Sequence, residues 1–460
     1  MTDRELLIVV LAAGKGTRMR SKLPKVLHQI AGRSMLGHVL QLAASYKQAR
    51  VSVVVGPDMS VVATEAGRWA SNVSVFVQEE AKGTAHAVLA AEAALADHVG
   101  DVVVLYADTP LVTRGTLDRL LDRLEAGDGV AVLGFEADDP TGYGRLICDD
   151  SGGLTAIREQ KDASVKERAV RLCNSGLMAF RMDGLHNVLK SIGNNNANGE
   201  YYLTDMVEMA RQCGLQAGVA VCDEDEVMGV NTRGQLAAAE ALWQQRARTE
   251  AMASGVTMID PRTVTLAYDT QLGRDVVLEP SVFFGPGVRV GDDVTIKANC
   301  HLEGIDAKSS AGVQVGSGSI IGPFARLRPG AHLGEGVHIG NFVEIKNATM
   351  AQSAKANHLT YIGDAEIGAG SNIGAGTIFC NYDGFEKAKS KLGKGVFVGS
   401  NSALVAPVEI GHGAYVGAGS TITRDVASNS LALERAPQTE KEGWAETFRE
   451  THKTPTSGKT

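Results

Sequence analysis

Short apolar runs alternate with longer segments of helical spacing over the first 229 residues. Five runs rich in Val, Ile and Leu have the length of buried strands: Leu6–Ala13, Val51–Val55, Val73–Val77, Val102–Tyr106 and Val130–Phe135. Helical spacing extends over Val26–Tyr46, Thr84–His98 and Thr116–Ala126. The alternation predicts an α/β domain over residues 1–229, with a Rossmann-like, mostly parallel sheet and helices on both faces. Such sheets bind ligands at the carboxyl ends of their strands.

A helix without proline follows. Residues 231–253 are rich in alanine, with Arg and Gln interspersed, and Gly255 stands where the helix is expected to end. We expect residues 230–255 to connect two domains.

From Leu272 onward the apolar positions recur every six residues. They run from Leu272 to Leu302, Val315 to Ile345, Tyr361 to Ile373 and Leu392 to Ile422, giving 21 hexad starts. Gly follows the start in 13 of these hexads, and the fourth residue after it is small, except at Asp306. Such a repeat predicts a triangular solenoid over residues 256–460, with the start pointing inward and glycine at the corners. Loops or interruptions are expected at 306–314, 351–360 and 379–391.

Composition agrees with two architectures and excludes several protein classes. Of 53 glycines, 26 fall between Leu272 and Val426. A net charge of −8 argues against general nucleic-acid binding, and no membrane-spanning run or secretory signal is visible. The six cysteines are scattered, which favours reduced thiols and a cytoplasmic protein over zinc or disulfides. The polar tail after about residue 447 is expected to be disordered.

A glycine-rich turn follows the first predicted strand. Residues 11–19 read LAAGKGTRM. Backbone N–H groups in such a turn can surround phosphates, although an ordinary strand-to-helix turn would have the same spacing. The turn lacks the third glycine of a dinucleotide fingerprint and the Gly-Lys-Ser/Thr ending of a P-loop.

Five other polar positions have both a structural and a functional interpretation. Asp108 follows a predicted buried strand, where an aspartate can be either a Mg²⁺ ligand or a helix cap. Asn231, considered by itself, favours a helix cap. His358 could be structural, exposed or a general base. Arg328 and Lys346 directly follow apolar starts, where glycine is common, so each is either an outward charge or part of a site.

Ordered motifs along residues 5–444 resemble the bacterial bifunctional enzymes that make UDP-N-acetylglucosamine. The first is the turn at 11–19 with Pro24 and Lys25 downstream, a pattern of sugar nucleotidyltransferases. The others are GTAHA at 83–87, YADTPL at 106–111, GYGR at 142–145, EQKD at 159–162, YLTD at 202–205 and GVN at 229–231. The hexads resemble the left-handed parallel β-helix of hexapeptide acyltransferases.

The resemblance implies roles in a uridylyltransferase site. Lys25 would neutralise phosphate charge, and Asp108 and Asn231 would bind Mg²⁺. Gln78 would contact the uracil. The remaining nucleotide- and sugar-binding residues would be Leu11, Ala12, Ala13, Gly14, Gly83, Thr84, Tyr106, Gly144, Glu159 and Asn174.

It also implies an acetyltransferase site in the solenoid, with His358 as the general base. Its sugar phosphate would be bound by Arg328, Lys346, Tyr361 and Asn372, and acetyl-CoA by Ala375, Asn381, Tyr382, Ser400, Ala418 and Arg435. The family often has Gly where Ala107 stands and Thr where Phe379 stands.

The expected function is acetyl transfer from acetyl-CoA to glucosamine-1-phosphate, then uridylyl transfer from UTP to N-acetylglucosamine-1-phosphate with release of pyrophosphate. The resemblance implies a homotrimer, with no nucleic-acid or membrane partner. Two alternatives are a single-activity nucleotidyltransferase with an oligomerising β-helix and a non-catalytic regulatory subunit.

Overall fold

The computed structural model describes residues 5–69, 73–182, 186–305 and 309–453. The chain forms two compact units. The first contains the residues up to Glu250 together with Leu266–Tyr268, and the second contains Ala251–Thr265 and the chain from Asp269 onward.

The first unit is built on a mixed sheet in the order β11-β7-β10-β6-β1-β4-β5. Its strands are β1 (Leu6–Leu11), β4 (Arg50–Val55), β5 (Val73–Val77), β6 (Asp101–Tyr106), β7 (Val130–Glu136), β10 (Leu172–Arg181) and β11 (Ala217–Cys222). Strand β10 runs antiparallel to both neighbours, and the other pairs on this path are parallel. The predicted parallel core and its five strands are confirmed.

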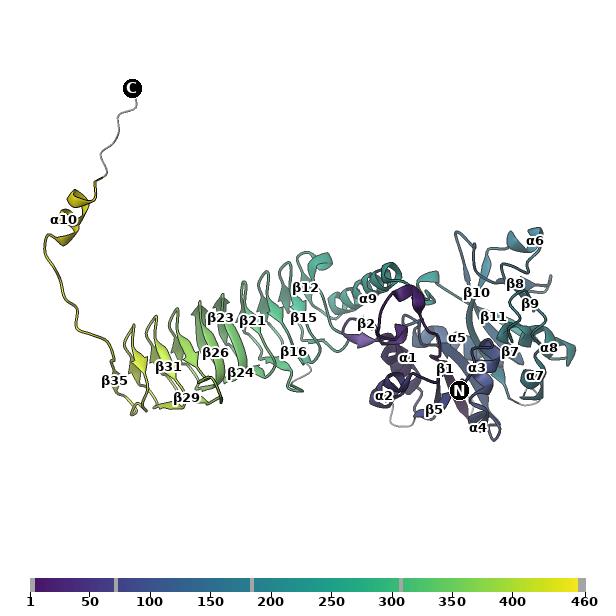
Figure 1. The fold of residues 1–460 in the computed structure, drawn as a ribbon, viewed down its shortest axis with the longest axis horizontal. Helices are drawn as coiled ribbons and strands as arrows, with labels where there is room; N and C mark the ends of the chain where they lie inside the picture. The colour runs from purple at the N-terminus through teal and green to yellow at the C-terminus, as the bar shows by residue number, and fades with distance from the viewer. Residues whose placement is uncertain (1–4, 70–72, 183–185, 306–308, 454–460) are drawn as a thin grey trace, which may run out of the picture. The chain divides into compact units, whose positions relative to one another are not determined.

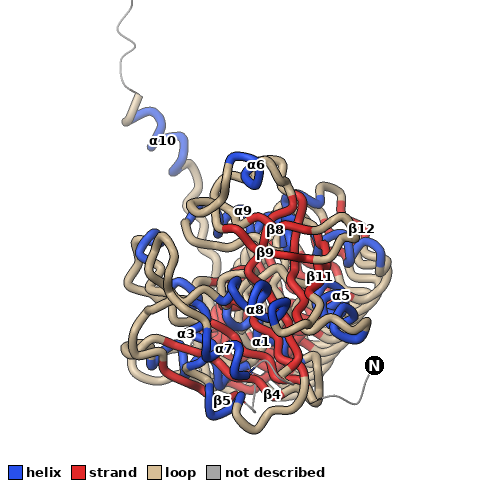
Figure 2. Tube along the Cα trace, turned by 90° about the vertical axis from the view of Figure 1, so that its right-hand side faces the viewer, coloured by secondary structure: helices blue, strands red, loops and turns tan. Residues whose placement is uncertain are grey.

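Helices cover both faces of this sheet (Figure 2). One face packs on α1 (Met35–Ala44), α2 (Ser60–Trp69) and α5 (Arg114–Glu125). The other packs on α3 (Thr84–Leu89), α4 (Glu92–Leu95), α7 (His186–Ser191) and α8 (Met206–Gln212). Along β1, Ile8 and Val10 join the first core, whereas Leu7 and Val9 join the second. This period of two is why a continuous apolar run can be a strand buried on both faces.

Two predicted helices have different bounds. Helix α1 begins only at Met35, because Ala31 and Gly32 turn the chain with positive φ between β2 (Gln29–Ile30) and β3 (Arg33–Ser34). The segment from Thr84 to His98 is divided into α3 and α4. A smaller hairpin, β8 (Arg145–Cys148) and β9 (Leu154–Arg158), leads to α6 (Val165–Arg168).

The predicted connector is helix α9 (Arg233–Ala253), which ends before Gly255 at φ +102°. The boundary between the two units, after Glu250, falls inside this helix. In the described residues, no helix has the length and apolarity needed to span a membrane.

The second unit is a left-handed parallel β-helix (Figure 1). Its short strands are β12 (Thr257–Met258), β13 (Gln271–Leu272), β14 (Val277–Leu278), β15 (Phe283–Phe284), β16 (Val288–Val290), β17 (Thr295–Ile296), β18 (His301–Leu302), β19 (Val313–Val315), β20 (Ile320–Ile321), β21 (Arg326–Leu327), β22 (Ala331–Leu333), β23 (His338–Asn341), β24 (Glu344–Met350), β25 (Lys355–His358), β26 (Tyr361–Ile367), β27 (Asn372–Ile373), β28 (Ile378–Cys380), β29 (Ser390–Leu392), β30 (Phe397–Val398), β31 (Ala403–Val405), β32 (Val408–Ile410), β33 (Tyr415–Val416), β34 (Thr421–Ile422) and β35 (Leu431–Ala432). Hexad starts stack in register on successive coils, as in the ladder from Leu302 through Leu327 to Ile345. The small fourth residues are buried as predicted, for example Val276 and Cys300.

The repeat differs from prediction in its middle. Residues 351–360 do not interrupt it, because Met350 and Ala356 are fully buried starts paired with Leu333 and Ile339. The next start is Ile362 rather than Tyr361, since Ile362 pairs with Ile345 and is fully buried. From Ile345 to Ile362 is 17 residues, whereas from Leu327 to Ile345 is 18. Tyr361 pairs with Ile378, so the next coil also has 17 residues, and two coils that are each one residue shorter hide the phase.

Two further features of the second unit differ from prediction. Phe379 is a fully buried position of β28, so the loop leaves the coil after it, and a larger apolar residue fits there. Helix α10 (Trp444–Thr451) occupies the start of the supposed disordered tail, with the rings of Trp444 and Phe448 stacked. Asp306 and residues 454–460 lie outside the described residues.

Glycine after the hexad start is required for close approach and not for the corner. A Cβ on Gly285 would lie 1.9 Å from the carbonyl oxygen of Glu303 on the next coil. The left-handed corner comes three residues after the start, as at Asn401 with φ +60°. The predicted corner role of these glycines is therefore wrong, and Arg328 and Lys346 stand in the close-approach column.

We expect Gly285→Ala to lower the stability of the β-helix by about 1–3 kcal/mol and its Tm by roughly 3–10 °C, because the added methyl meets backbone of the next coil. Thermal unfolding followed by circular dichroism measures this. The matched control is Gly370→Asn, at a corner with φ +67° and open space, where asparagine is tolerated elsewhere. Equal loss in both variants would contradict the assignment of the glycine columns.

Candidate active sites

The carboxyl ends of four parallel strands meet at one edge of the first unit. Leu11 at the end of β1 pairs with Tyr106 at the end of β6, and the N–H of Ala12 donates to Val54 O of β4 (2.7 Å). The N–H of Gln78, just after β5, donates to Val55 O (2.8 Å). The predicted nucleotide residues from three separated segments therefore lie along one edge.

The glycine-rich turn after β1 covers Lys25. Gly16 has φ +61°, and a Cβ there would lie 2.4 Å from the Cβ of Lys25, so only glycine fits. Gly14 is exposed, with no atom within 4 Å of a Cβ placed on it, whereas Lys25 is 9% exposed. Ala13 lies between the buried Ala12 and this open glycine. The turn thus presents backbone to solvent above a buried ammonium group.

Lys25, Asp108 and Asn231 converge at the end of β6. The Lys25 ammonium forms an ion pair with the Asp108 carboxylate and donates to Asn231 Oδ1 at 2.9 Å. The N–H of Val230 donates to Asp108 O at 2.9 Å, which fixes Asn231 beside the carboxylate. The Asp108 carboxylate and the Asn231 amide oxygen both contact the Lys25 ammonium. Oxygen atoms of these two kinds are suitable ligands for Mg²⁺. The donor set of the two predicted metal ligands therefore fits a hard cation.

Gln78, Gly83 and Thr84 form a second group at the same edge. The Gln78 amide donates to Gly83 O (3.2 Å), and Thr84 Oγ1 accepts from the N–H of Leu203 (2.9 Å). Gly83 has φ +117°, and a Cβ there would lie 2.5 Å from Tyr201 O. Burial, followed by the Asp108 charge, raises the pKa of Tyr106, so its hydroxyl stays protonated.

The three predicted sugar-binding residues of the first unit come together at Gly144, which has no side chain. The N–H of Asn174 donates to Gly144 O (2.8 Å), and a Cβ on Gly144 would lie 3.3 Å from Glu159 Oε1. Burial and the charges of Asp162 and Asp205 raise the pKa of Glu159. A carboxyl group facing a side-chain-free position can accept hydrogen bonds from sugar hydroxyls.

In the β-helix, Arg328 and Lys346 occupy neighbouring positions of one column. Leu327 pairs with Ile345, so the residues after them are adjacent on successive coils, and Lys346 pairs with Gly363. The Tyr361 hydroxyl fills the space at Gly363, 2.4 Å from where a Cβ would stand. This column therefore holds two cations followed by a phenol hydroxyl.

Lys387 completes the cationic cluster, and sequence reasoning missed it. Hydrogen bonding to Lys387, burial and the charges of Lys387 and Arg328 lower the pKa of Lys346. Asp364 partly opposes this, and Arg328 pairs with Glu344 Oε1 at 2.8 Å. Crowded cations suit an anion such as phosphate. Lys387 belongs to the loop after β28, whose return to the coil has no signal in the repeat.

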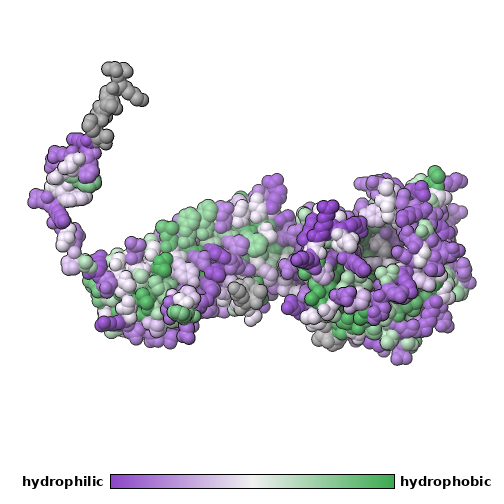
Figure 3. All heavy atoms as spheres, viewed as in Figure 1, coloured by the Kyte–Doolittle hydropathy of each residue, from purple (hydrophilic) through white to green (hydrophobic). Residues whose placement is uncertain are grey.

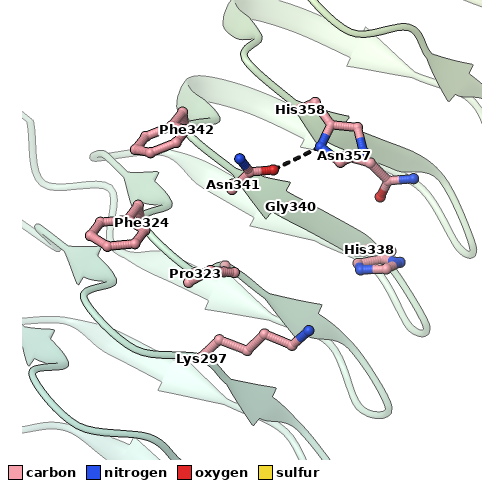
Figure 4. A pocket seen from close by; sticks show the side chains of 10 residues that line it. Lys297, Pro323, Phe324, His338, Gly340, Asn341, Phe342, Asn357 and His358 are labelled. Atoms are coloured by element: carbon pink, nitrogen blue, oxygen red, sulfur yellow. Dashed lines mark hydrogen bonds between the residues drawn. The ribbon is translucent and has the colours of Figure 1, made fainter.

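His358 ends β25 on a different sheet from Arg328 and Lys346. Its Nδ1 lies 2.7 Å from Asn341 Oδ1, at the paired position of β23 (Figure 4). Because an amide oxygen only accepts, Nδ1 carries the proton and Nε2 is left as a base. The pair lines an open cavity of about 420 Å³ with Phe324, Phe342 and the His338 ring. Asn372 lies on the next strand of this sheet, β27, and sequence reasoning missed Asn341.

Four of the predicted acetyl-CoA residues form a line across successive coils. The N–H of Asn401 donates to Ala375 O, and the N–H of Gly419 donates to Ser400 O. Arg435 donates to Ala418 O at 2.9 Å. Asn381 and Tyr382 lie on the loop after β28, where Asn381 donates to Asp364 and the Tyr382 hydroxyl donates to Gly384 O (2.5 Å).

Comparisons with known proteins agree with both units. Residues 8–169 match the MobA-like NTP transferase domain, and residues 312–347 and 389–424 match the bacterial transferase hexapeptide. The chain is 56% identical to the "Bifunctional protein GlmU" of Xanthobacter autotrophicus over 99% of this chain and all of that protein. It is 56% identical to the protein of the same name from Azorhizobium caulinodans and 55% to that from Bradyrhizobium sp., each over 98% of both chains.

Identity of 55–56% extends over 98% or more of each chain. It therefore includes both the residues at the sheet edge and the residues in the columns of the β-helix. The chain therefore belongs to the family of bifunctional GlmU proteins.

Proposed function

We propose that this protein makes UDP-N-acetylglucosamine by two reactions at two separate sites. The β-helix acetylates glucosamine-1-phosphate with acetyl-CoA, and the first unit transfers a uridylyl group from UTP to the product. The observation that carries the proposal is that one chain holds both polar clusters: Lys25 with Asp108 and Asn231, and His358 with Asn341. We divide the chain into a uridylyltransferase domain at 1–229, a connector at 230–255 and an acetyltransferase domain at 256–460.

In uridylyl transfer, an oxygen of the sugar phosphate attacks the α-phosphorus of UTP, and pyrophosphate leaves. The turn at Leu11–Gly14, which is open to solvent at Gly14, offers backbone donors to the nucleotide, and Lys25 balances charge as it moves onto the leaving group. Mg²⁺ held by Asp108 and Asn231 supplies further charge neutralisation when bound. Gln78, held by its bond to Gly83, contacts the uracil, and Gly144, Glu159 and Asn174 hold the sugar.

In acetyl transfer, the amine of glucosamine-1-phosphate attacks the acetyl thioester carbonyl, and the thiolate of CoA leaves. His358 Nε2 accepts the proton released by the nitrogen. Asn341 keeps His358 in the productive tautomer through the bond to Nδ1. Arg328, Lys346 and Lys387 bind the phosphate, Tyr361 and Asn372 contact the sugar, and the line from Ala375 to Arg435 holds acetyl-CoA with Asn381 and Tyr382.

We further propose a homotrimer assembled through the β-helix. Phe324, Phe342 and Leu359 are corner residues on successive coils with φ between +49° and +57°, and their exposed fractions are 49%, 55% and 60%. A bulky side chain in this backbone region costs about 1–2 kcal/mol. Apolar side chains gather on the visible surface of the β-helix in Figure 3. Burial by neighbouring subunits would offset the strain, and their residues would close the open cavity at His358.

The two alternatives are disfavoured by specific contacts. An inert oligomerising β-helix has no need for a histidine with a fixed tautomer on one sheet and a cluster of crowded cations on another. A regulatory subunit has no need for Lys25, Asp108 and Asn231 to converge.

The separation of sites predicts a double dissociation. We expect His358→Ala to lower acetyl transfer by about 10²–10⁴-fold, the range of general-base catalysis, with uridylyl transfer intact. Asp108→Ala should lower uridylyl transfer by about 100-fold or more and leave acetyl transfer intact. Free CoA and pyrophosphate, assayed with purified protein, UTP, acetyl-CoA, Mg²⁺ and the matching sugar phosphates, report the two reactions. Loss of both activities in either folded variant would refute separate sites.

The lowered pKa of Lys346 predicts a pH effect. Lys346 loses its charge as pH rises through its lowered pKa, and phosphate binding weakens there. Lys387→Gln removes the ammonium that lowers this pKa, so the alkaline rise in KM for glucosamine-1-phosphate should begin at higher pH. At neutral pH the same variant should bind about tenfold more weakly, since one charge-assisted contact is lost. Lys389→Gln is the control, because Lys389 pairs with Glu366. An alkaline onset at unchanged or lower pH in Lys387→Gln would contradict the coupling.

The trimer predicts a change in mass. Phe342→Asp places charge at the apolar corner and should convert trimers to smaller species, measured by light scattering, with uridylyl transfer retained. Val221→Asp, at an exposed valine of the first unit, controls for the added charge and should leave the mass unchanged. A wild-type monomer, or an undiminished trimer in Phe342→Asp, would overturn this assembly.

A further inference from the structure

Among the residues that the structure describes, Arg145 is the largest fully buried side chain, at 1% exposure. Its guanidinium donates to Tyr143 O, to Gln160 Oε1 (2.7 Å) and to Arg168 O (3.4 Å). Within the described part of the chain, Nε has no hydrogen-bond partner and no carboxylate forms an ion pair with Arg145.

Such burial is unfavourable for stability. Taking a guanidinium out of water without a carboxylate partner carries a large desolvation penalty, and an apolar side chain of similar volume is often the more stable choice. The neutral acceptors around Arg145 offset only part of this. A buried charge that lowers stability in this way indicates a need to fix the positions of the groups that it contacts.

The contacts of Arg145 lie beside all three sugar residues. Arg145 follows Gly144, and it bonds Tyr143 O on the other side of that glycine. Its second acceptor, Gln160, directly follows Glu159. At the start of β8, Arg145 also pairs across the sheet with Cys173, which precedes Asn174. The guanidinium therefore joins two of the segments that carry a sugar residue, and the third pairs with the backbone of the same arginine.

The geometry in front of Arg145 has little tolerance. A Cβ on Gly144 would lie 3.3 Å from the Glu159 carboxylate and 3.5 Å from Asn174 Cβ. Small shifts of the Gly144 turn or of the Glu159 segment would close or widen this space. A planar donor with several N–H groups can hold both segments at fixed distances, which a single ammonium cannot do.

We propose that Arg145 is a positioning residue of the sugar-binding part of the uridylyltransferase site. It joins the Gly144 turn to the segment after Glu159 and so sets the spacing among Gly144, Glu159 and Asn174. It acts behind the site, because its own guanidinium is buried. The inference rests on the proposed uridylyl transfer to N-acetylglucosamine-1-phosphate.

The test is a split in KM. In Arg145→Lys, we expect KM for N-acetylglucosamine-1-phosphate to rise tenfold or more, while KM for UTP stays within twofold of wild type. Acetyl transfer by the β-helix should be unchanged, which reports an intact second unit in the same sample. Arg171→Lys is the control, since Arg171 is an exposed arginine that bonds Ala137 O and Asp138 nearby.

A second pair of variants keeps Arg145 and so avoids the risk of misfolding. Gln160→Leu removes one acceptor and should raise KM for the sugar phosphate in the same direction, by severalfold. Gln160→Glu retains an acceptor and adds a carboxylate, so it should restore KM to near the wild-type value.

The possible results distinguish a failure of the proposed function from a failure of the positioning role of Arg145. Absence of uridylyl transfer in wild type would overturn the proposed function itself. If wild type is active, equal changes in both KM values, or no change in Gln160→Leu, would overturn the positioning role alone.

Discussion

Both halves of this protein depend on parallel strand pairing, which places equivalent positions of successive strands side by side. In the first unit it brings the ends of β1, β4, β5 and β6 to one edge, so residues from separate segments meet there. In the β-helix it stacks each hexad position into a column. One rule of hydrogen bonding thus produces both the sheet edge where we propose that the nucleotide binds and the column of cations where we propose that the phosphate binds.

The same rule explains what could be predicted from the sequence. Buried parallel strands are apolar throughout, so the five core strands stand out, and hexad periodicity reveals the coil. Residues that break a column, such as Arg328 and Lys346, are visible for the same reason. Asp108 and Asn231 were found through motif resemblance, and the structure then places both against Lys25.

The misses have a common cause, because they depend on neighbours in space. The step from Ile362 to Ile367 has five residues, so counting back six from Ile367 gives Tyr361 in place of the inward Ile362, and no apolar pattern distinguishes the two. Asn341 reaches His358 only because β23 pairs with β25. Lys387 reaches Lys346 from a loop that lies outside the repeat.

Unfavourable local terms gather where the proposed chemistry lies. Lys346 lies against two other cations, Arg145 is buried with no carboxylate paired to it in the described part of the chain, and Phe342 has a left-handed backbone conformation. Each arrangement lowers the stability of the isolated chain, by like-charge repulsion, desolvation or strain. A bound anion would relieve the repulsion at Lys346, and burial by a neighbouring subunit would offset the strain at Phe342. At Arg145 the desolvation is offset by the fixed spacing of the segments that the guanidinium holds. Because the long ladders and two apolar cores supply stability elsewhere, the chain can keep these groups in place before their partners bind.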